Sequence, residues 1–510
     1  MSQLREVGIP AQPLDRFLPL LGEAVVGEAN RAVDEARDAM EGRVFWHVNS
    51  TARGGGVAEI LQALLPYARG AGIDARWLVI GGKSEFFRIT KRLHNALHGS
   101  TGDGSALGER ERAVYEDVIR ANADELLQSI RPGDVLVLHD PQTAGLAPYL
   151  IGAGAIVVWR SHIGKEQPNE EVERGWAFLA PYLDSVAATV FSREAYIPDC
   201  CDRERAVVIP PSIDPFTPKN QDLEEANVRA ILARSGLVGD KGGGHGPGGD
   251  APSFVRQNGS SGNVGRQADV IGRGKAPDWE APLVVQVSRW DRLKDPVGVL
   301  KGFARLDGNL PEDARLLLAG PGGNSVADDP ESSDIFEKLT QAWQDLPSAD
   351  RNRVSIASLP MADLEENAAI VNALQRHAAV VVQKSLDEGF GLTVTEAMWK
   401  GRPIVATAVG GIQDQITHDV HGLLVQDPEN LGEFGDSLIR VLNDRPLAKR
   451  LGEEARERVR EEYLCVRHLV QYAKLLTRLD ASSLKGWCTI EPVLHRSGEG
   501  CPIGSSGTSL

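Results

Sequence analysis

The chain has 510 residues, of which 42% are hydrophobic and 25% charged, an ordinary globular composition for two or three domains. The formal net charge of −16 excludes a nonspecific grip on nucleic acid or anionic lipid, because both need a basic face. Five cysteines without a CxxC pair disfavour a disulfide framework and a zinc site. No secretory signal pattern and no membrane-spanning apolar run occur, so we expect a cytoplasmic protein.

The first part of the chain predicts a helical extension followed by an α/β domain. Residues 1–40 form the extension, in which 24–40 is an amphipathic helix. Residues 41–220 then alternate helices with short apolar strands, predicted at 43–48, 75–82, 134–140, 155–162, 185–192 and 205–212. Strands alternating with helices predict a parallel sheet that is covered on both faces.

The second part repeats the α/β pattern after an interruption. Residues 239–280 are rich in glycine and lack periodicity, which predicts a flexible insertion without chemistry. Residues 281–455 form a second α/β domain, followed by C-terminal helices over 456–481 and a flexible tail over 482–510. These last helices could pack against the N-terminal domain. Predicted strands lie at 282–290, 314–320, 354–359, 378–385, 403–409 and 422–426.

The most specific motif is the string EGFGLTVTE, in which Glu388 and Glu396 stand eight positions apart. Glycines after Glu388 let backbone N–H groups approach an anion, and a helix that begins before Glu396 favours negative charge at its N-terminus. Carboxylates on either side suit sugar and ribose hydroxyls. The motif therefore indicates a sugar-nucleotide site, although by itself it also fits a turn followed by an acidic helix.

A second motif, SRWDRLKD, follows the apolar strand VVQV. Arg289 and Lys294 can converge on a diphosphate, the arginine through its planar fork and the lysine as a point charge. Two cations on a loop can equally be solvated. This motif therefore supports a diphosphate site only in combination with the first motif.

A glycine turn, Gly54-Gly55-Gly56, follows the first strand. It is neither GxGxxG nor a Walker motif, and no acidic residue ends a strand about 20 residues later, which disfavours a dinucleotide site. Asp140 and His162 end two further strands, at the sheet edge where open α/β folds bind ligands. Structural roles for both residues stay open, and we expect His47 and His139 to be structural.

Taken together, these strings resemble the retaining glycosyltransferases of family four. The pair SRxxxxK and E-x7-E identifies the superfamily, and WHVNSTARGGGVAEIL, HDPQTAG, WRSHIG and PPSIDPFTPKN resemble the trehalose glycosyltransferring synthases and the related retaining trehalose phosphorylases. The resemblance covers roughly residues 43–475 without the insertion. It implies the GT-B fold, in which two Rossmann-like domains with parallel sheets face each other across a cleft.

The resemblance also implies roles on the nucleotide-sugar side. Arg289 and Lys294 would hold the diphosphate, Glu388 would bind the hydroxyls of the transferred sugar, and Glu396 would bind the ribose. Backbone amides that help hold phosphate or sugar are those of Gly389, Phe390, Gly391 and Leu392.

On the opposite side, Gly55 and Gly56 would close on the donor phosphate, and His162 would lie near the anomeric carbon and the 6-hydroxyl of the donor sugar. Asp140 is the candidate acceptor ligand. The catalytic set is thus His162, Arg289, Lys294 and Glu388, with no metal ligand and no obligatory cofactor.

The function implied is transfer of glucose from an NDP-glucose donor to glucose, forming α,α-trehalose with retention. Retaining trehalose phosphorolysis and a non-catalytic sugar-nucleotide sensor are the alternatives. Partners are expected to be sugars and nucleotide-sugars, not nucleic acid or membrane. The preferred nucleobase, the acceptor, the direction of reaction and the subunit count, a homodimer included, stay open.

Overall fold

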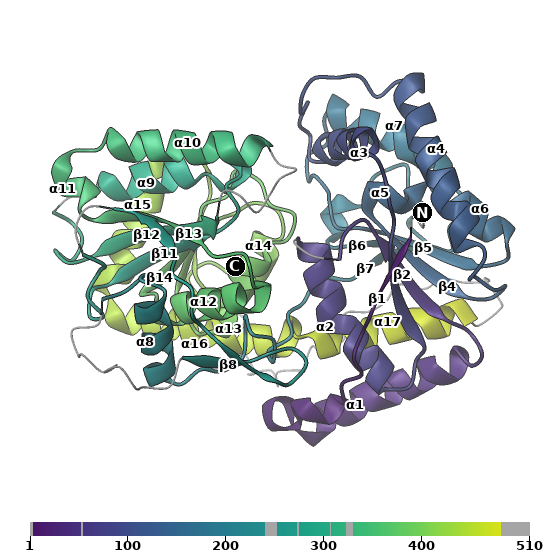
Figure 1. Cartoon of the computed structure of the whole chain (residues 1–510), viewed down its shortest axis with the longest axis horizontal. Coiled ribbons are helices and arrows are strands. Elements are labelled where there is room, and N and C mark those ends of the chain that lie inside the picture. Colours follow the sequence, from purple (N-terminus) through teal and green to yellow (C-terminus); the bar gives the residue numbers. More distant parts are fainter. Residues whose placement is uncertain are drawn as a thin grey trace, which may run out of the picture.

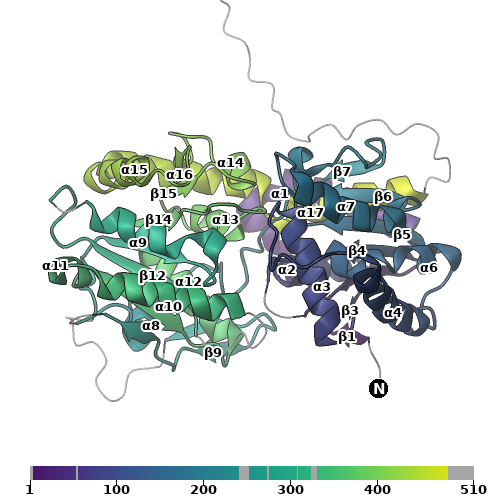
Figure 2. The ribbon, with the colours of Figure 1, turned by 90° about the horizontal axis from the view of Figure 1, so that it is seen from above.

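The computed structural model describes residues 4–52, 55–239, 252–272, 275–306, 308–322 and 330–480. Two α/β domains lie side by side, with the N-terminal domain at the right of Figure 1 and the C-terminal domain at the left. Figure 2 shows the same division from above. No helix of these residues is long and apolar enough to cross a membrane. The expected tail over 482–510 lies outside the described residues.

The N-terminal domain is built on a seven-stranded sheet in the order β1-β3-β2-β4-β5-β6-β7. Successive residues of its strands enter cores on opposite faces: Phe45 joins one core, and Trp46 joins the other. This burial on both faces explains why the strands are apolar runs. The strands are β1 (Arg5–Val7), β2 (Phe45–Asn49), β3 (Ala75–Val79), β4 (Val135–His139), β5 (Ile156–Ser161), β6 (Ala188–Phe191) and β7 (Ala206–Val208).

Helices cover both faces of this sheet. They are α1 (Leu18–Ala39), α2 (Gly56–Gly70), α3 (Ser84–Leu97), α4 (Glu109–Leu126), α5 (Asp140–Ala144), α6 (Ala147–Gly152) and α7 (Glu170–Leu183), with 3-10 turns at Leu14–Phe17 and Glu194–Tyr196. The expected helix of the extension is present as α1. The extension also supplies β1, which pairs antiparallel with β3 and was not predicted.

The C-terminal domain is built on a second seven-stranded sheet in the order β10-β13-β12-β11-β14-β15-β16. Apart from the antiparallel β10, its strands are parallel. The prediction of two Rossmann-like domains with mostly parallel sheets is therefore confirmed. The strands are β10 (Asp269–Ile271), β11 (Leu283–Val287), β12 (Arg315–Pro321), β13 (Val354–Leu359), β14 (Val380–Gln383), β15 (Ile404–Thr407) and β16 (Leu423–Val425).

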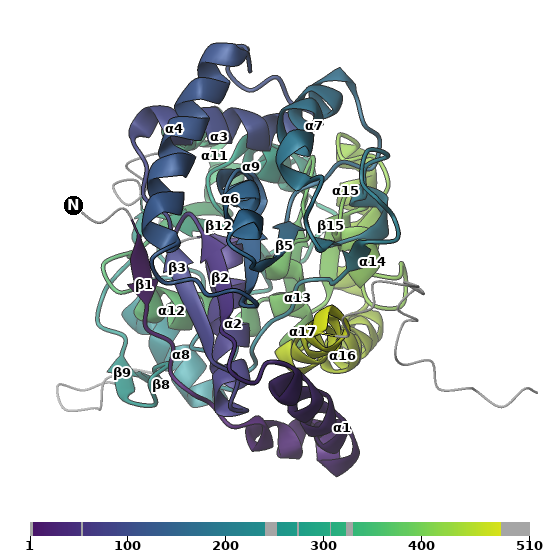
Figure 3. The same ribbon diagram turned by 90° about the vertical axis from the view of Figure 1, so that its right-hand side faces the viewer.

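The last helix that the structure describes, α17, crosses back to the N-terminal domain. In Figures 1 and 3, α17 lies alongside α1 beneath the first sheet, and its Tyr472 shares a core with Val33 and Leu64. The second half of the chain contains α8 (Glu225–Arg234), α9 (Pro296–Ala304), α10 (Pro330–Gln344), α11 (Ser348–Arg351), α12 (Leu364–His377), α13 (Leu392–Trp399), α14 (Ile412–Gln415), α15 (Leu431–Asn443), α16 (Arg445–Glu462) and α17 (Cys465–Asp480), with a 3-10 turn at Arg292–Lys294.

The glycine-rich range 239–280 departs from the expectation of an unstructured insertion. Residues 252–272 contain a hairpin of β8 (Ser253–Val255) and β9 (Ser261–Asn263), followed by the edge strand β10. Phe254 and Val264 are buried in the core of the C-terminal domain. Arg266 forms an ion pair with the buried Glu366 of α12, and Glu366 also accepts a hydrogen bond from the Arg266 amide at 2.8 Å. These long-range contacts, which local periodicity does not record, order the segment.

Candidate active site

The loop after β11 carries the two predicted cations. Asp291 accepts a hydrogen bond from the Leu293 amide at 2.8 Å and so forms a tight turn. Asp295, in the left-handed region at φ +45°, caps α9 by accepting from the Gly298 amide at 2.9 Å, and it forms an ion pair with the buried Lys384. Because the loop is held at both ends, Lys294 has a defined position.

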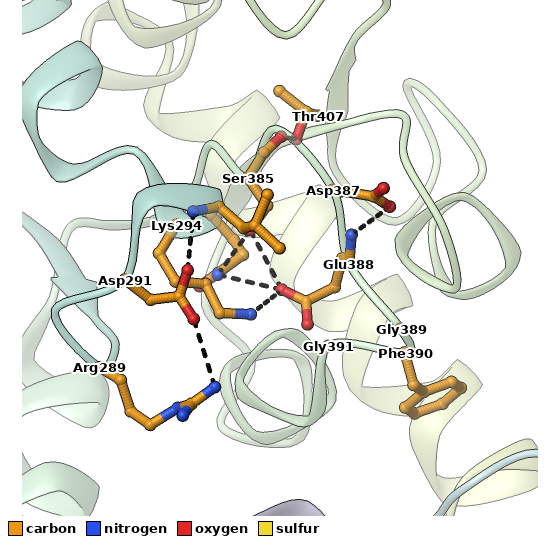
Figure 4. Close-up of polar contacts among 12 residues, drawn as sticks. Arg289, Asp291, Lys294, Ser385, Asp387, Glu388, Gly389, Phe390, Gly391 and Thr407 are labelled. Atoms are coloured by element: carbon orange, nitrogen blue, oxygen red, sulfur yellow. Dashed lines mark hydrogen bonds and ion pairs between the residues drawn. The ribbon is translucent and has the colours of Figure 1, made fainter. Parts of the chain in front are cut away.

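Lys294 meets Glu388, which lies 94 residues later in the chain. The Lys294 ammonium group contacts Glu388 Oε2, and the Ser385 hydroxyl donates to the same oxygen at 3.1 Å (Figure 4). The Glu388 amide donates to Asp387 at 2.9 Å, which fixes the backbone before the glycine turn. The two most specific sequence motifs therefore come together through their charged side chains.

Arg289 lies on the same loop but is less constrained than Lys294. Its side chain is 57% exposed, and one guanidinium nitrogen lies 3.4 Å from Asp291 Oδ2. Figure 4 shows Arg289 on the same side of the loop as Lys294 and Glu388. Such a side chain can turn toward an anion at little cost, because its ion pair is solvent-exposed and weak.

The glycine turn leads directly into α13. Gly391 has φ +89° and is the N-cap of the helix, a conformation that favours glycine. The Gln415 side-chain amide donates to the Phe390 carbonyl at 2.6 Å and holds the turn from behind. In general the first amides of a helix lack a carbonyl partner in a preceding turn, so the turn before α13 is suited to an anion or to hydroxyl oxygens.

The N-terminal domain contacts this turn directly. Gly56 stands against Leu392, since a Cβ on Gly56 would lie 3.6 Å from Leu392 Cδ1. A Cβ on Gly389 would similarly lie 3.2 Å from the His162 carbonyl oxygen. The Tyr196 hydroxyl lies 3.0 Å from the carbonyl oxygens of both Glu388 and Gly389. Predicted residues of both domains therefore meet at one interdomain surface.

His162 and Asp140 are adjacent on the N-terminal side of this surface. The His162 amide donates to Asp140 Oδ1 at 2.8 Å, and Asp140 itself is in the left-handed region at φ +61°. Burial raises the pKa of Asp140 to about 7, against the opposing effects of the His162 amide and Arg160. Burial, then the nearby Arg160 charge, lowers the pKa of His162 well below its usual value, so the imidazole is neutral.

His162 is the first of three imidazoles that form a chain into the N-terminal domain. His162 Nε2 lies 3.0 Å from His139 Nδ1, and His139 Nε2 lies 2.9 Å from His47 Nδ1. His47 and His139 are buried, in keeping with the structural roles expected of them.

Glu396 lies on the first turns of α13 and is only 2% exposed. Burial raises the pKa of its carboxyl, while the Lys219 ammonium group, 2.9 Å from Glu396 Oε1, opposes that shift. Lys219 was not singled out from the sequence, although it lies within the string PPSIDPFTPKN.

Tyr196 and Lys165 are further contacts that sequence reasoning missed. Lys165 forms a 2.5 Å ion pair with Asp387 across the domains. Nothing in the local sequence marks either residue, because their partners lie about 190 and 220 positions away.

Comparison with protein families agrees with this division into domains. The family model of the trehalose synthase N-terminal domain matches residues 47–198. The family model of the group 1 glycosyl transferases matches residues 364–458. The second match includes the glycine turn and α13.

Individual relatives extend the similarity to nearly the whole chain. The trehalose synthase of Pyrococcus horikoshii is 33% identical over 94% of this chain and 99% of its own length. A trehalose phosphorylase of Pleurotus sajor-caju is 25% identical over 88% of this chain and 59% of its own length. The crystal structure of an α,α-trehalose 6-phosphate synthase from Burkholderia multivorans superposes with a TM-score of 0.61 at 18% identity, covering 86% of this chain and 100% of that chain.

The structural likeness confirms the expected GT-B fold, and the relatives confirm the resemblance drawn from the motifs. With a third of its residues identical to a trehalose synthase along almost the entire length of both chains, this protein belongs to the trehalose synthase family of glycosyltransferases.

Proposed function

We propose that the protein transfers glucose from a nucleoside diphosphate glucose to glucose and forms α,α-trehalose with retention of configuration. The observation that carries this proposal is similarity to trehalose synthases through both domains, together with the meeting of Lys294 and Glu388 beside the glycine turn. Both the predicted donor half and the predicted acceptor half are present in this chain.

On the donor side, Arg289 and Lys294 hold the diphosphate. Glu388 binds hydroxyls of the transferred sugar, and its contact with Lys294 and Ser385 orients the carboxylate before the donor arrives. The amides from Gly389 to Leu392 face the phosphate or the sugar, and Glu396 receives the ribose.

On the opposite side, Gly55 and Gly56 approach the donor phosphate at the start of α2, where a side chain would obstruct it. His162 stands beside the donor sugar as a neutral imidazole, because burial and Arg160 disfavour its protonation. Asp140, joined to the His162 amide, receives the acceptor hydroxyls.

In the reaction, the bond between the anomeric carbon and the diphosphate oxygen breaks, and a bond to the acceptor's anomeric oxygen forms on the same face. The acceptor proton passes to the departing phosphate. Negative charge grows on the diphosphate, so positioned cations and N–H dipoles lower the barrier. Loss of either cation would cost on the order of 3 kcal/mol of transition-state stabilisation.

Retaining trehalose phosphorolysis is the second candidate, favoured by the similarity to the Pleurotus sajor-caju phosphorylase. Free phosphate would then occupy the place of the nucleotide diphosphate against the same cations.

A substrate panel tests the two functions. Purified protein is offered ADP-, UDP- or GDP-glucose with glucose, and the product is analysed for a non-reducing disaccharide by chromatography and NMR. Parallel reactions contain trehalose and inorganic phosphate without nucleotide. Trehalose formed only from a nucleotide-sugar supports the synthase. Glucose 1-phosphate formed without nucleotide would instead establish the phosphorylase.

The acceptor role of Asp140 predicts a pH dependence. Its pKa of about 7 means that the ionised carboxylate, the stronger hydroxyl acceptor, becomes populated as the pH rises through 7. We expect the KM for glucose to fall between pH 6 and pH 8 in the wild type and to stay flat in Asp140→Asn. Initial rates at saturating donor measure this, and a wild-type KM that is independent of pH would remove Asp140 from the acceptor site.

A further inference from the structure

The segment that carries Lys219 belongs to the C-terminal domain, although it follows the last strand of the N-terminal sheet. The Asn372 side-chain amide donates to the carbonyl oxygens of Pro218 at 3.0 Å and Gln221 at 2.8 Å. Between these two residues, the backbone carbonyl of Asn220 accepts a hydrogen bond from the Trp399 indole at 3.1 Å. Lys219 is therefore fixed beside α13, the helix that carries Glu396.

The Lys219 ammonium group contacts both domains at once. It lies 2.9 Å from Glu396 Oε1 and 3.2 Å from each carboxylate oxygen of Glu59. Glu59 is in the first turn of α2, directly after the Gly55-Gly56 turn. The bridge Glu59–Lys219–Glu396 thus joins the beginning of α2 to the buried carboxylate of α13.

The second oxygen of that carboxylate differs from the first in its contacts. Glu396 Oε2 is buried and makes no hydrogen bond with any residue in the described part of the chain. A buried carboxylate oxygen without a donor is costly and rare, and it marks a place for an outside hydroxyl group.

We infer that Lys219 is a positioning residue that couples ribose binding at Glu396 to the approach of α2, so that nucleotide binding and domain closure reinforce each other. This inference rests on the proposed function, in which Glu396 receives the ribose. Lys219 contacts Oε1, so Oε2 remains able to accept a hydrogen bond from a ribose hydroxyl. Through Glu59, the same ammonium group holds the turn that faces the diphosphate.

The charges around Glu396 explain why Lys219 is needed. Lys219 faces the carboxyl from the segment after the first sheet, Glu59 faces it from α2, and Lys400 faces it from the C-cap of α13. Burial lowers the pKa of Lys400 to about 7, so this lysine is a weak counterion. Without Lys219, burial and the Glu59 charge would both favour a protonated Glu396.

The test measures nucleotide binding and turnover in four variants: Lys219→Met, Lys219→Arg, Glu59→Gln and Glu396→Gln. ADP and UDP are titrated calorimetrically into the full-length protein at pH 6, 7 and 8, and kcat and KM are measured with the matching nucleotide-glucose. For Lys219→Met we expect Kd to rise about 10-fold at pH 7, and further at pH 6, because Glu396 becomes protonated. Lys219→Arg should restore binding and remove the pH dependence.

Glu59→Gln distinguishes coupling between the two domains from simple electrostatic stabilisation of Glu396 by Lys219. It leaves Lys219 on Glu396 but weakens the link to α2. Because coupling is reciprocal, the nucleotide Kd should rise about 5-fold, equally at pH 6, 7 and 8, and kcat should fall about 5-fold. A nucleotide Kd in Lys219→Met that equals the wild-type value at every pH would overturn the inference, as would an unchanged kcat in Glu59→Gln. If Glu396→Gln also binds nucleotide normally, the ribose assignment itself fails. Thermal melting curves check that each variant is folded.

Discussion

Lys294→Ala is expected to lower kcat by about 100- to 1,000-fold, the usual cost of removing one group that stabilises charge in the transition state. The ammonium group is held at Glu388 by a loop anchored through Asp291 and Asp295, so it needs no rearrangement to meet a leaving diphosphate. Arg289→Ala should give a comparable loss. Steady-state rates at saturating donor and acceptor measure the effect.

The matched control for Lys294→Ala is Arg292→Ala. Arg292 is a cation on the same loop, but its side chain is exposed. We expect this control to keep kcat within about 2-fold, since isolated surface charges contribute little. Equal losses in the two variants would show that the loop acts through its overall charge and would refute a specific role of Lys294.

Gly410→Ala is expected to reduce activity by about 100-fold, because a displacement of about 1 Å in a reacting group can cost that much. Gly410 has φ +50°, and a Cβ there would overlap the Glu388 carbonyl and lie 2.8 Å from the Tyr196 hydroxyl. The Glu388 backbone would have to move, and the carboxylate beside Lys294 would move with it.

Gly236→Ala is the control for backbone strain alone. Gly236 has φ +76°, but a Cβ there would meet nothing within 4 Å. Both variants should lose about 1–2 kcal/mol of folding stability from the left-handed conformation, and Gly410→Ala should lose more because its Cβ also overlaps the Glu388 carbonyl. Urea unfolding measures both losses. Only Gly410→Ala should lose activity in the folded state. Full activity in folded Gly410→Ala would show that the position of the Glu388 backbone does not govern turnover.

Much of the fold was predictable because both sheets are buried on two faces. Strands such as 134–140 and 354–359 were apparent as apolar runs, and the structure places β4 and β13 there. The four strands β1, β8, β9 and β10 were missed. They are three residues each, largely exposed, and stabilised by pairing and by contacts such as Arg266–Glu366, which a local pattern does not contain.

The chemistry of the candidate site could be predicted from the sequence because its charged and glycine residues occur in specific motifs. The motifs predict that Lys294, Glu388 and the glycine turn belong to one site, and the structure places Lys294 against Glu388 beside that turn. Tyr196, Lys165 and Lys219 were not identified as members, since a tyrosine or a lysine in a connecting loop has no pattern that distinguishes it from a surface residue.

By itself, the sequence determined the two α/β domains, the family and the identity of the charged motifs, because hydrophobic periodicity and residue chemistry are local properties of the chain. Only the tertiary structure decided which groups meet: that α17 returns to the N-terminal sheet, that Gly389 rests against His162, and that Lys219 joins Glu59 to Glu396. These contacts join segments up to several hundred residues apart, and they depend on how the packed domains fit together.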